Sequence, residues 1–529
     1  MSEPSSRAAT GQTEPGRPRS IALVGPYGSG KSALFDELLS AAGAAARHAV
    51  DSRGHTMSTE LRLGHCTYLG DHWSILDCPG SVEFTAAEAA ALAVVDLAVV
   101  VCEPTPSRAL AVAPLLKALD EAQLPHLIFV NKMDTQDASV RDTLAALQAH
   151  SREPLVLRQV PIREDGRITG YADVVSERAY RYREGKASEL VRLPSHVEAQ
   201  EQEARDALVE VLADRDDALL EQVIEGVVLS SEQIFGRVRA DQMAGAIVEV
   251  LFGAAEHGNG IRRLWKALRH DVPDAAETAA RRGIAADGEP LAQVFKTVQA
   301  GHTGRLSYAR VWRGTIKDGM TLNGARIGGM FRMSAGEPAR VQEAGAGELV
   351  VFSRLERAVT GDVLSASGSA PPLPFPHAPP PVYGLAIASE DRKDDVKLSG
   401  ALQKLADEDP SLQIATSPET GETVLRGQGE IHLKAAVERL ARAYGLRVKT
   451  TRPRVPFKET IRHAVHQHTR LKRQTGGHGQ FADVKLDIAP RGRGEGFLFV
   501  DRIVGGAVPR QYIPAVADAA ETACQKGPL

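Results

Sequence analysis

The sequence has few cysteines, and they form no pattern. Cys66, Cys78, Cys102 and Cys524 are scattered along 529 residues without a CxxC spacing. This distribution argues against a zinc ribbon and against a disulfide framework. We therefore expect the four residues to be buried as small hydrophobic side chains.

Long apolar runs are also lacking. No run approaches the roughly 18 residues that a membrane-spanning helix requires. Residues 1–19 are rich in Ser, Pro, Gly, Arg and Glu and lack the apolar core of a signal peptide. We expect a flexible N-terminal tail and a cytoplasmic protein without membrane contacts.

Neither sign of charge dominates. The formal net charge is -4, with 25% charged and 43% hydrophobic residues, which is ordinary for a soluble globular protein. Such a charge gives no global attraction to nucleic acid, so RNA contacts must come from local basic patches, and DNA is not an expected partner. The length of 529 residues predicts about three to five domains.

The N-terminal part predicts a doubly wound α/β domain. The apolar run 20–25 ends in a Gly-rich turn, and residues 31–42 have helix-forming composition. Further apolar strands alternate with alanine- and leucine-rich helical segments, which indicates a parallel sheet covered by helices. The strands are expected at 73–76, 97–101 and 126–130, and the helices include 84–94 and 107–122.

The remaining segments predict a multidomain α/β protein. Residues 155–240 interrupt the first pattern with a hairpin-like stretch (168–183) and an acidic helical stretch (198–226), which we interpret as an insertion. Short strands between Gly turns then indicate a β-barrel. A proline-rich stretch indicates a stiff extended linker. A β-α-β-β-α order suits a ferredoxin-like fold.

A fourth α+β region begins with strands near residue 457 and includes a helix near 514–525. The predicted boundaries are a tail at 1–19, a nucleotide-binding domain at 20–284, a β-barrel at 285–369, the linker at 370–381, a ferredoxin-like domain at 382–456 and a fourth domain at 457–529.

The turn after the first predicted strand carries a phosphate-binding motif. Residues 25–32, Gly-Pro-Tyr-Gly-Ser-Gly-Lys-Ser, match G-x-x-x-x-G-K-[ST] between a strand and a helix. Glycines let backbone N–H groups surround phosphates, the lysine neutralises β/γ charge, and the serine hydroxyl coordinates Mg²⁺. The alternative, a Gly-rich turn without a ligand, is disfavoured by the flanking elements. The residues so predicted are Gly25, Gly28, Ser29, Gly30, Lys31 and Ser32.

Two further motifs follow apolar strands. Asp77-Cys-Pro-Gly80 places a carboxylate near the metal and a glycine whose N–H can sense a γ-phosphate. In Asn131-Lys132-Met-Asp134, the Asp134 carboxylate can accept two hydrogens from a guanine edge, while Asn131 braces the loop and Lys132 can stack. Because the carboxyl ends of parallel strands meet at one crevice, we predict that GTP or GDP binds there with Mg²⁺.

The order of these motifs resembles that of the GTPase superfamily, and its translational branch fits best. Residues 53–56, Arg-Gly-His-Thr, resemble the switch I motif of that branch, in which the threonine, here Thr56, reaches Mg²⁺ and the γ-phosphate. Residues 253–255 resemble the last guanine-contacting loop, whose backbone, here at Ala254 and Ala255, can bond the base oxygen. The resemblance implies that Ser32, Thr56 and Asp77 hold the metal.

The resemblance to bacterial elongation factor G extends beyond this domain. Similar motifs occur at 305–314 for its second domain, at 405–410 and 427–433 for its third, and at 474–481 and 503–506 for its fourth. By comparison with the family, the chain ends within a partial fourth domain of the ribosomal-protein type. The resemblance implies a monomer that acts on the ribosome through rRNA and ribosomal proteins, with tRNA and mRNA as further candidate partners.

Ser81 departs from the family pattern. It stands where elongation factor G has a histidine that orients the attacking water, and phosphoryl transfer depends on such positioning. We expect weak GTP hydrolysis, with Lys31 and Thr56 as the other catalytic candidates. The alternatives are that another residue or a water substitutes, or that His55 serves. Gly28 in place of the family's aspartate and a short switch I favour altered switching with nucleotide binding retained.

A basic stretch lies in the fourth region. Its members are His463, His466, His468, Arg470, Lys472 and Arg473. A metal site is disfavoured because no carboxylate or cysteine has matching spacing. Two interpretations of the stretch are left open, a basic surface that contacts RNA phosphates and an ordinary exposed strand. The following loop, 475–479, resembles the tip that the family inserts toward the decoding centre.

These features favour a translocation-type GTPase of the ribosome. The alternative is a nucleotide-gated ribosome-binding factor, active in protection, recycling or regulation, with negligible turnover. A decayed paralogue is a third possibility, against which the intact guanine motifs count.

Overall fold

The computed structural model describes residues 16–44, 57–135, 139–183, 185–300, 304–334, 337–474, 477 and 479–527. The chain divides into two compact units, one formed by Met1–Thr416 with Thr423–Arg452 and the other by Ser417–Glu422 with Pro453–Leu529. Most of the predicted tail lies outside the described residues. The helices in the described ranges lack the length and apolar character that a membrane span needs.

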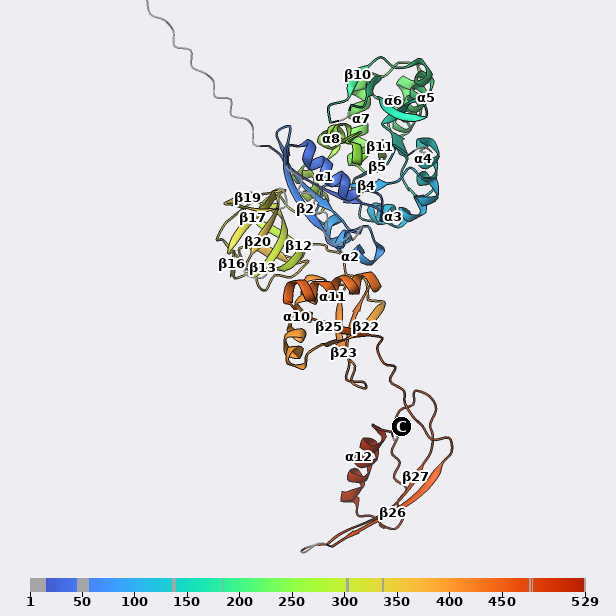
Figure 1. Cartoon of the computed structure of the whole chain (residues 1–529), viewed down its shortest axis with the longest axis vertical. Helices are drawn as coiled ribbons and strands as arrows, with labels where there is room; N and C mark the ends of the chain where they lie inside the picture. Colours follow the sequence, from blue (N-terminus) through green and yellow to red (C-terminus); the bar gives the residue numbers. More distant parts are fainter. Residues whose placement is uncertain are drawn as a thin grey trace, which may run out of the picture. The chain divides into compact units, whose positions relative to one another are not determined.

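A central sheet organises the N-terminal domain, coloured blue to green in Figure 1. Its parallel strands are buried apolar runs, as expected for a sheet covered on both faces. In spatial order they are β3 (Asp71–Asp77), β1 (Pro18–Val24), β4 (Leu97–Cys102), β5 (His126–Val130), β11 (Val248–Phe252) and β6 (Leu155–Leu157).

An additional strand, β2 (Arg62–Tyr68), pairs antiparallel with β3. Leu69 and Gly70 join the two strands, and both have positive φ, 49° and 94°. A two-residue hairpin turn with positive φ at both positions matches the twist of the flanking strands. The sheet is therefore mixed, whereas the sequence predicted only parallel strands.

Helices cover both faces of this sheet. α1 (Lys31–Ala41) and α8 (Ile261–Asp271) pack on one face. On the other face lie α2 (Thr85–Leu92), α3 (Ala113–Glu121) and α4 (Val140–Gln148). The predicted doubly wound fold is confirmed. The helix expected at 84–94 forms as α2 after a 3-10 turn, Val82–Phe84, whereas the first part of the helix expected at 107–122 is a 3-10 turn, Pro106–Ala111, and only the rest is α-helical.

The insertion has its own hydrophobic core. Because β6 belongs to the central sheet, the inserted elements begin after Leu157 rather than at residue 155. They form an antiparallel sheet in the order β10-β9-β8-β7 and three helices. Their bounds are β7 (Gln159–Glu164), β8 (Arg167–Asp173), β9 (Arg178–Arg181), β10 (Glu189–Val191), α5 (Ser195–Ala213), α6 (Asp217–Ile224) and α7 (Ser231–Met243). The chain then returns through β11 and α8 and leaves the domain through α9 (Ala275–Arg281).

The second domain is the expected β-barrel, coloured yellow-green to yellow in Figure 1. Its longest strands, β12 (Leu291–Ala300) and β13 (Gly304–Arg313), pair antiparallel. From β13 the fully buried Arg310 reaches the N-terminal domain, where its Nη2 lies 2.6 Å from Oδ1 of the equally buried Asp96. The remaining strands are β14 (Thr315–Lys317), β15 (Thr321–Leu322), β16 (Ala325–Arg326), β17 (Gly329–Ser334), β18 (Glu337–Val341), β19 (Glu343–Gly345), β20 (Leu349–Ser353) and β21 (Val363–Ser365).

The third domain has the predicted ferredoxin-like topology. Between β21 and β22 the chain contains neither helix nor strand, as its prolines led us to expect. The sheet order is β23-β24-β22-β25, and two helices pack on it. The elements are β22 (Tyr383–Ser389), α10 (Asp395–Glu408), β23 (Gln413–Thr416), β24 (Thr423–Gly427), α11 (Glu430–Tyr444) and β25 (Val448–Thr451).

The smaller unit contains a hairpin of β26 (Val465–Arg473) and β27 (Gln480–Ile488), and helix α12 (Ile513–Cys524). No strand forms near residue 457, where one was expected, among the described residues. The expectation that all cysteines are buried is wrong. Cys78 and Cys102 are buried, but Cys66 is only half-buried, and Cys524 is exposed because the described part of this unit has no buried core.

Candidate nucleotide-binding site

The predicted phosphate-binding loop connects β1 to α1. Gly25, Gly28 and Gly30 have φ values of 140°, 84° and 89°, a backbone region that favours glycine. A Cβ on Gly30 would lie 2.3 Å from Nδ2 of Asn131, so the loop closes directly against the guanine motif. No side chain among the described residues caps the start of α1. Its first N–H groups therefore suit an anion.

Lys31 and Gly80 lie side by side under this loop. The Lys31 ammonium donates to the carbonyls of Gly25 at 2.8 Å and Pro26 at 3.0 Å. A Cβ on Gly80 would lie 2.3 Å from the Lys31 Nζ and 2.9 Å from backbone atoms of Pro26 and Tyr27, so the close approach of this loop favours glycine. Burial lowers the pKa of Lys31, against the opposing effect of nearby carboxylates. The structure thus brings together the two groups that were expected to meet the β- and γ-phosphates.

The carboxylate of Glu88, on α2, approaches the phosphate-binding loop. Burial raises the pKa of Glu88 to about 7, although the Lys31 charge and a hydrogen bond from the Gly25 N–H both favour its ionised form. Sequence analysis missed Glu88, because no motif marks it.

The two metal-binding candidates that the structure describes are in contact. The Ser32 hydroxyl donates to Oδ2 of Asp77 at 2.8 Å. Asp77 is fully buried, and its Oδ1 has no hydrogen-bond partner among the described residues. Hard oxygen donors of this kind are what Mg²⁺ prefers, so these side chains fit the ion. The third candidate, Thr56, lies outside the described residues, together with the rest of 53–56.

Asn131 and Lys132 connect three loops of the site. The Asn131 amide donates to the carbonyl of Ser29 at 2.9 Å, and its oxygen accepts from the N–H of Ala255 at 2.9 Å. Lys132 donates to the carbonyl of Gly28 at 2.6 Å and to Glu103, also at 2.6 Å. The bracing role expected of Asn131 is therefore present, whereas Lys132 extends toward the phosphate-binding loop.

The predicted base-reading residues lie at the end of β5 and after β11. Asp134 is 39% exposed, and its Oδ2 lies 3.2 Å from Nε2 of His257, a residue that sequence analysis did not select. The N–H of Ala254 donates to the carbonyl of Asn259 at 3.0 Å, so the amides of Ala254 and Ala255 both have partners within the protein. Their contact with a base stays a prediction.

Ser81 follows Gly80 but does not project freely from the loop. It is the N-terminal cap of the 3-10 turn Val82–Phe84, and its hydroxyl accepts from the N–H of Glu83 at 3.4 Å. The Glu83 carboxylate in turn accepts from the backbone N–H of His432 at 2.6 Å, at the start of α11. The segment that carries Ser81 is thus attached to the third domain.

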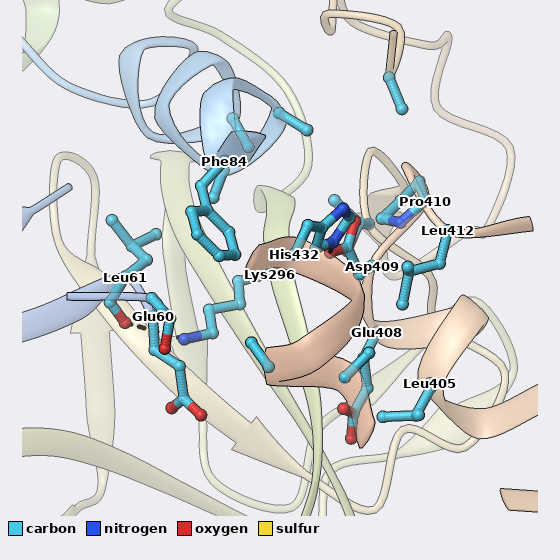
Figure 2. A pocket seen from close by; sticks show the side chains of 18 of the residues that line it. Glu60, Leu61, Phe84, Lys296, Leu405, Glu408, Asp409, Pro410, Leu412 and His432 are labelled. Atoms are coloured by element: carbon cyan, nitrogen blue, oxygen red, sulfur yellow. Dashed lines mark hydrogen bonds and ion pairs between the residues drawn. The ribbon is translucent and has the colours of Figure 1, made fainter. Parts of the chain in front are cut away.

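A cavity of about 690 Å³ lies beside this attachment. Residues of the N-terminal, barrel and third domains line it, and Figure 2 shows Phe84 and His432 on its wall. Lys296 points toward Leu61, whose carbonyl accepts its ammonium proton at 2.8 Å. His432 pairs with Asp409 at 2.8 Å, and its ring centroid is 5.4 Å from that of Phe84. No local sequence pattern predicts this cavity, because the residues that line it are far apart in the chain.

Three residues of the basic stretch of the smaller unit contact aspartates across the hairpin. His466 lies 2.5 Å from Asp487 of β27, and His468 and Arg470 lie 2.6 and 2.7 Å from Asp483. The antiparallel register places Asp487 opposite His466 and Asp483 opposite Arg470, so these carboxylates reach the basic residues across the hairpin. No group of three metal-ligating side chains occurs in the described parts of the chain.

Models of known protein families match most of the chain. Family models match at residues 17–274 (elongation factor Tu GTP binding domain), 289–367 (elongation factor G domain 2), 378–452 (elongation factor G, domain III) and 453–529 (elongation factor G, domain IV).

One curated relative and one solved structure illustrate the similarity. The chain is 45% identical over 525 residues to an elongation factor G-like protein of Synechocystis sp. (strain ATCC 27184 / PCC 6803 / Kazusa), covering 97% of this chain and 78% of the relative. A crystal structure of a Thermus thermophilus protein matches with a TM-score of 0.85 and 29% identity, again over 97% of this chain and 78% of the other.

Proposed function

The chain belongs to the elongation factor G-like family of translational GTPases, and from this premise we propose that it binds GTP and GDP with Mg²⁺ and acts on the ribosome as a translocation-type factor. The observation that carries the nucleotide assignment is the position of Asn131, whose side chain bonds both the phosphate-binding loop and the Ala255 loop. One amide thus fixes the distance between the phosphate and base ends of the site.

Each residue then has a defined task. With nucleotide bound, Lys31 would exchange its two carbonyl partners for the β- and γ-phosphates, and the Gly80 N–H would be available to the γ-phosphate. Ser32 and Asp77, with the predicted Thr56, hold Mg²⁺. The ion neutralises phosphate charge when bound. Asp134 selects guanine because its two oxygens accept from N–H groups that adenine does not present in that pattern.

Hydrolysis is proposed to be slow, and the position of Ser81 supports this. Its hydroxyl is shorter than an imidazole and accepts from the Glu83 N–H in the turn that follows Gly80, so it is poorly placed to orient water. The same observation favours the second candidate function, a nucleotide-gated ribosome-binding factor for protection, recycling or regulation with negligible turnover.

The proposed partners are the ribosome, through rRNA and ribosomal proteins, and tRNA and mRNA bound to it. A monomer is expected. On β26, Arg470 pairs with Asp483 across the hairpin, so this arginine is less available to phosphates than the sequence suggests.

Ribosome-stimulated GTP hydrolysis by the native chain, Ser81→His and Ser81→Ala tests this proposal. We expect slow native turnover, a large increase for Ser81→His and little change for Ser81→Ala. Native turnover equal to that of the histidine variant would refute slow hydrolysis. Cosedimentation with ribosomes in GTP, GDP or a non-hydrolysable analogue separates the two candidate functions, since nucleotide-dependent binding without turnover favours the second.

A further inference from the structure

Arg62, the first residue of β2, contacts the carboxylate that is proposed to hold Mg²⁺. Its Nε donates to Oδ2 of Asp77 at 3.0 Å, and its Nη2 lies 3.0 Å from the same oxygen. The antiparallel register of β2 and β3 sets Arg62 directly opposite Asp77. The contact therefore follows from strand pairing and does not depend on a flexible loop.

The guanidinium group of Arg62 is held on its other sides as well. It lies 4.5 Å from the centroid of the Phe35 ring, and its Nη2 approaches Oδ1 of Asp36 at 3.4 Å. Asp77 is completely buried, and a buried carboxylate needs a compensating positive charge. Arg62 supplies that charge from within the chain.

The same oxygen of Asp77 receives the Ser32 hydroxyl. A metal ion that binds Ser32 and Asp77 therefore meets a cation already placed on its ligand. The ion must either displace Arg62 or share the Asp77 carboxylate with it. Two positive charges on one buried carboxylate repel each other strongly. Asp36 provides Arg62 with a second acceptor if it moves.

We propose that Arg62 is a built-in counter-ion of Asp77 that competes with Mg²⁺ and lowers the affinity of the nucleotide site for the ion. Arg62 is a positioning residue and not a catalytic one. This inference rests on the proposed guanine-nucleotide binding. If Arg62 acts in this way, the protein holds Mg²⁺ weakly and keeps its fold when the ion is lost.

The test is a Mg²⁺ titration of the full chain with N-methylanthraniloyl-GDP, read by fluorescence, for native protein, Arg62→Gln and Arg62→Lys. We expect the Mg²⁺ midpoint to fall about tenfold in Arg62→Gln, because the ion no longer competes with a charge-assisted contact. Arg62→Lys keeps the charge without the planar fork, so its midpoint should lie between the two.

Thermal unfolding supplies a second measurement. Without nucleotide and with EDTA, Arg62→Gln should unfold at a lower temperature than native protein, and saturating Mg²⁺ and GDP should reduce this difference. Arg340→Gln is the matched control, since it removes an arginine 2.7 Å from Asp318 in the barrel. It should leave the Mg²⁺ midpoint unchanged.

A purely structural role for Arg62 would lower stability under both conditions without tightening Mg²⁺ binding, and that result would overturn the proposal. So would an unchanged or raised Mg²⁺ midpoint in Arg62→Gln. If Arg62→Gln does not fold, an Arg62→Lys midpoint equal to the native one overturns it. Failure of native protein to bind the GDP probe would instead overturn the proposed nucleotide function.

Discussion

Replacing Glu83 by alanine removes the cap of α11, a helix of a different domain. Gly429 precedes α11 and has no side chain, and the Glu83 carboxylate takes the place of a cap by accepting from the His432 N–H at 2.6 Å. A Cβ on Gly429 would lie 2.3 Å from Cδ of Glu83, so this approach requires glycine. Glu83→Ala and Gly429→Ala thus disrupt one contact from its two sides.

The expected loss of stability at the start of α11 follows from the type of hydrogen bond that is removed. A hydrogen bond to a charged group contributes about 1.5–3 kcal/mol, and a carboxylate at a helix N-terminus adds a favourable dipole interaction. A local loss of about 2 kcal/mol corresponds to about thirtyfold. Glu83→Gln keeps an acceptor without the charge and should lose less.

Native-state hydrogen exchange is the appropriate assay, because a multidomain chain does not unfold in a single transition. Amides in the first turn of α11 should exchange about thirtyfold faster in Glu83→Ala and Gly429→Ala. Val82→Ala changes a side chain that is 83% exposed in the same turn and should have no such effect. Unchanged exchange at His432 in Glu83→Ala would refute the capping role.

Three other perturbations have defined outcomes. Arg310→Leu leaves Asp96 buried without its charged partner and should lower the opening free energy of β13 amides by about 3–5 kcal/mol in native-state hydrogen exchange; a loss below about 1 kcal/mol would contradict this. Because burial raises the pKa of Glu88 to about 7, the folded state binds a proton more tightly than the unfolded state, and stability falls as pH rises toward 7. Glu88→Gln should remove this fall, so unfolding temperatures that stay parallel for the two proteins from pH 5 to 8 would argue against it. Gly28→Asp, which restores the family's aspartate, should lower stability by about 1–2 kcal/mol, since φ is 84° there; a thermal shift near zero would show that the loop adapts.

The fold was largely predictable because its signals are local. Buried parallel strands are continuous apolar runs, so β1, β4 and β5 stand out in the sequence itself. Motifs at the ends of these strands predicted which loops would meet, and the contacts of Asn131 show that they do. The β-α-β-β-α order likewise indicated the third domain.

The remaining site residues depend on pairings that no short pattern encodes. Arg62 reaches Asp77 only through the antiparallel register of β2, a strand that was not predicted. Glu83 caps α11 only because Gly429, far away in sequence, leaves room for its carboxylate beside the His432 N–H. The aspartates opposite His466 and Arg470 were missed for the same reason, since cross-strand neighbours do not share a spacing along the chain.

The most direct test of guanine-nucleotide binding is isothermal titration calorimetry of the purified chain with GDP and with ADP in Mg²⁺. We expect one GDP to bind per chain, no detectable ADP binding, and loss of GDP binding in Asp134→Ala. Equal affinity for the two nucleotides, or no binding of GDP, would contradict the assignment of the site between Lys31 and Asp134.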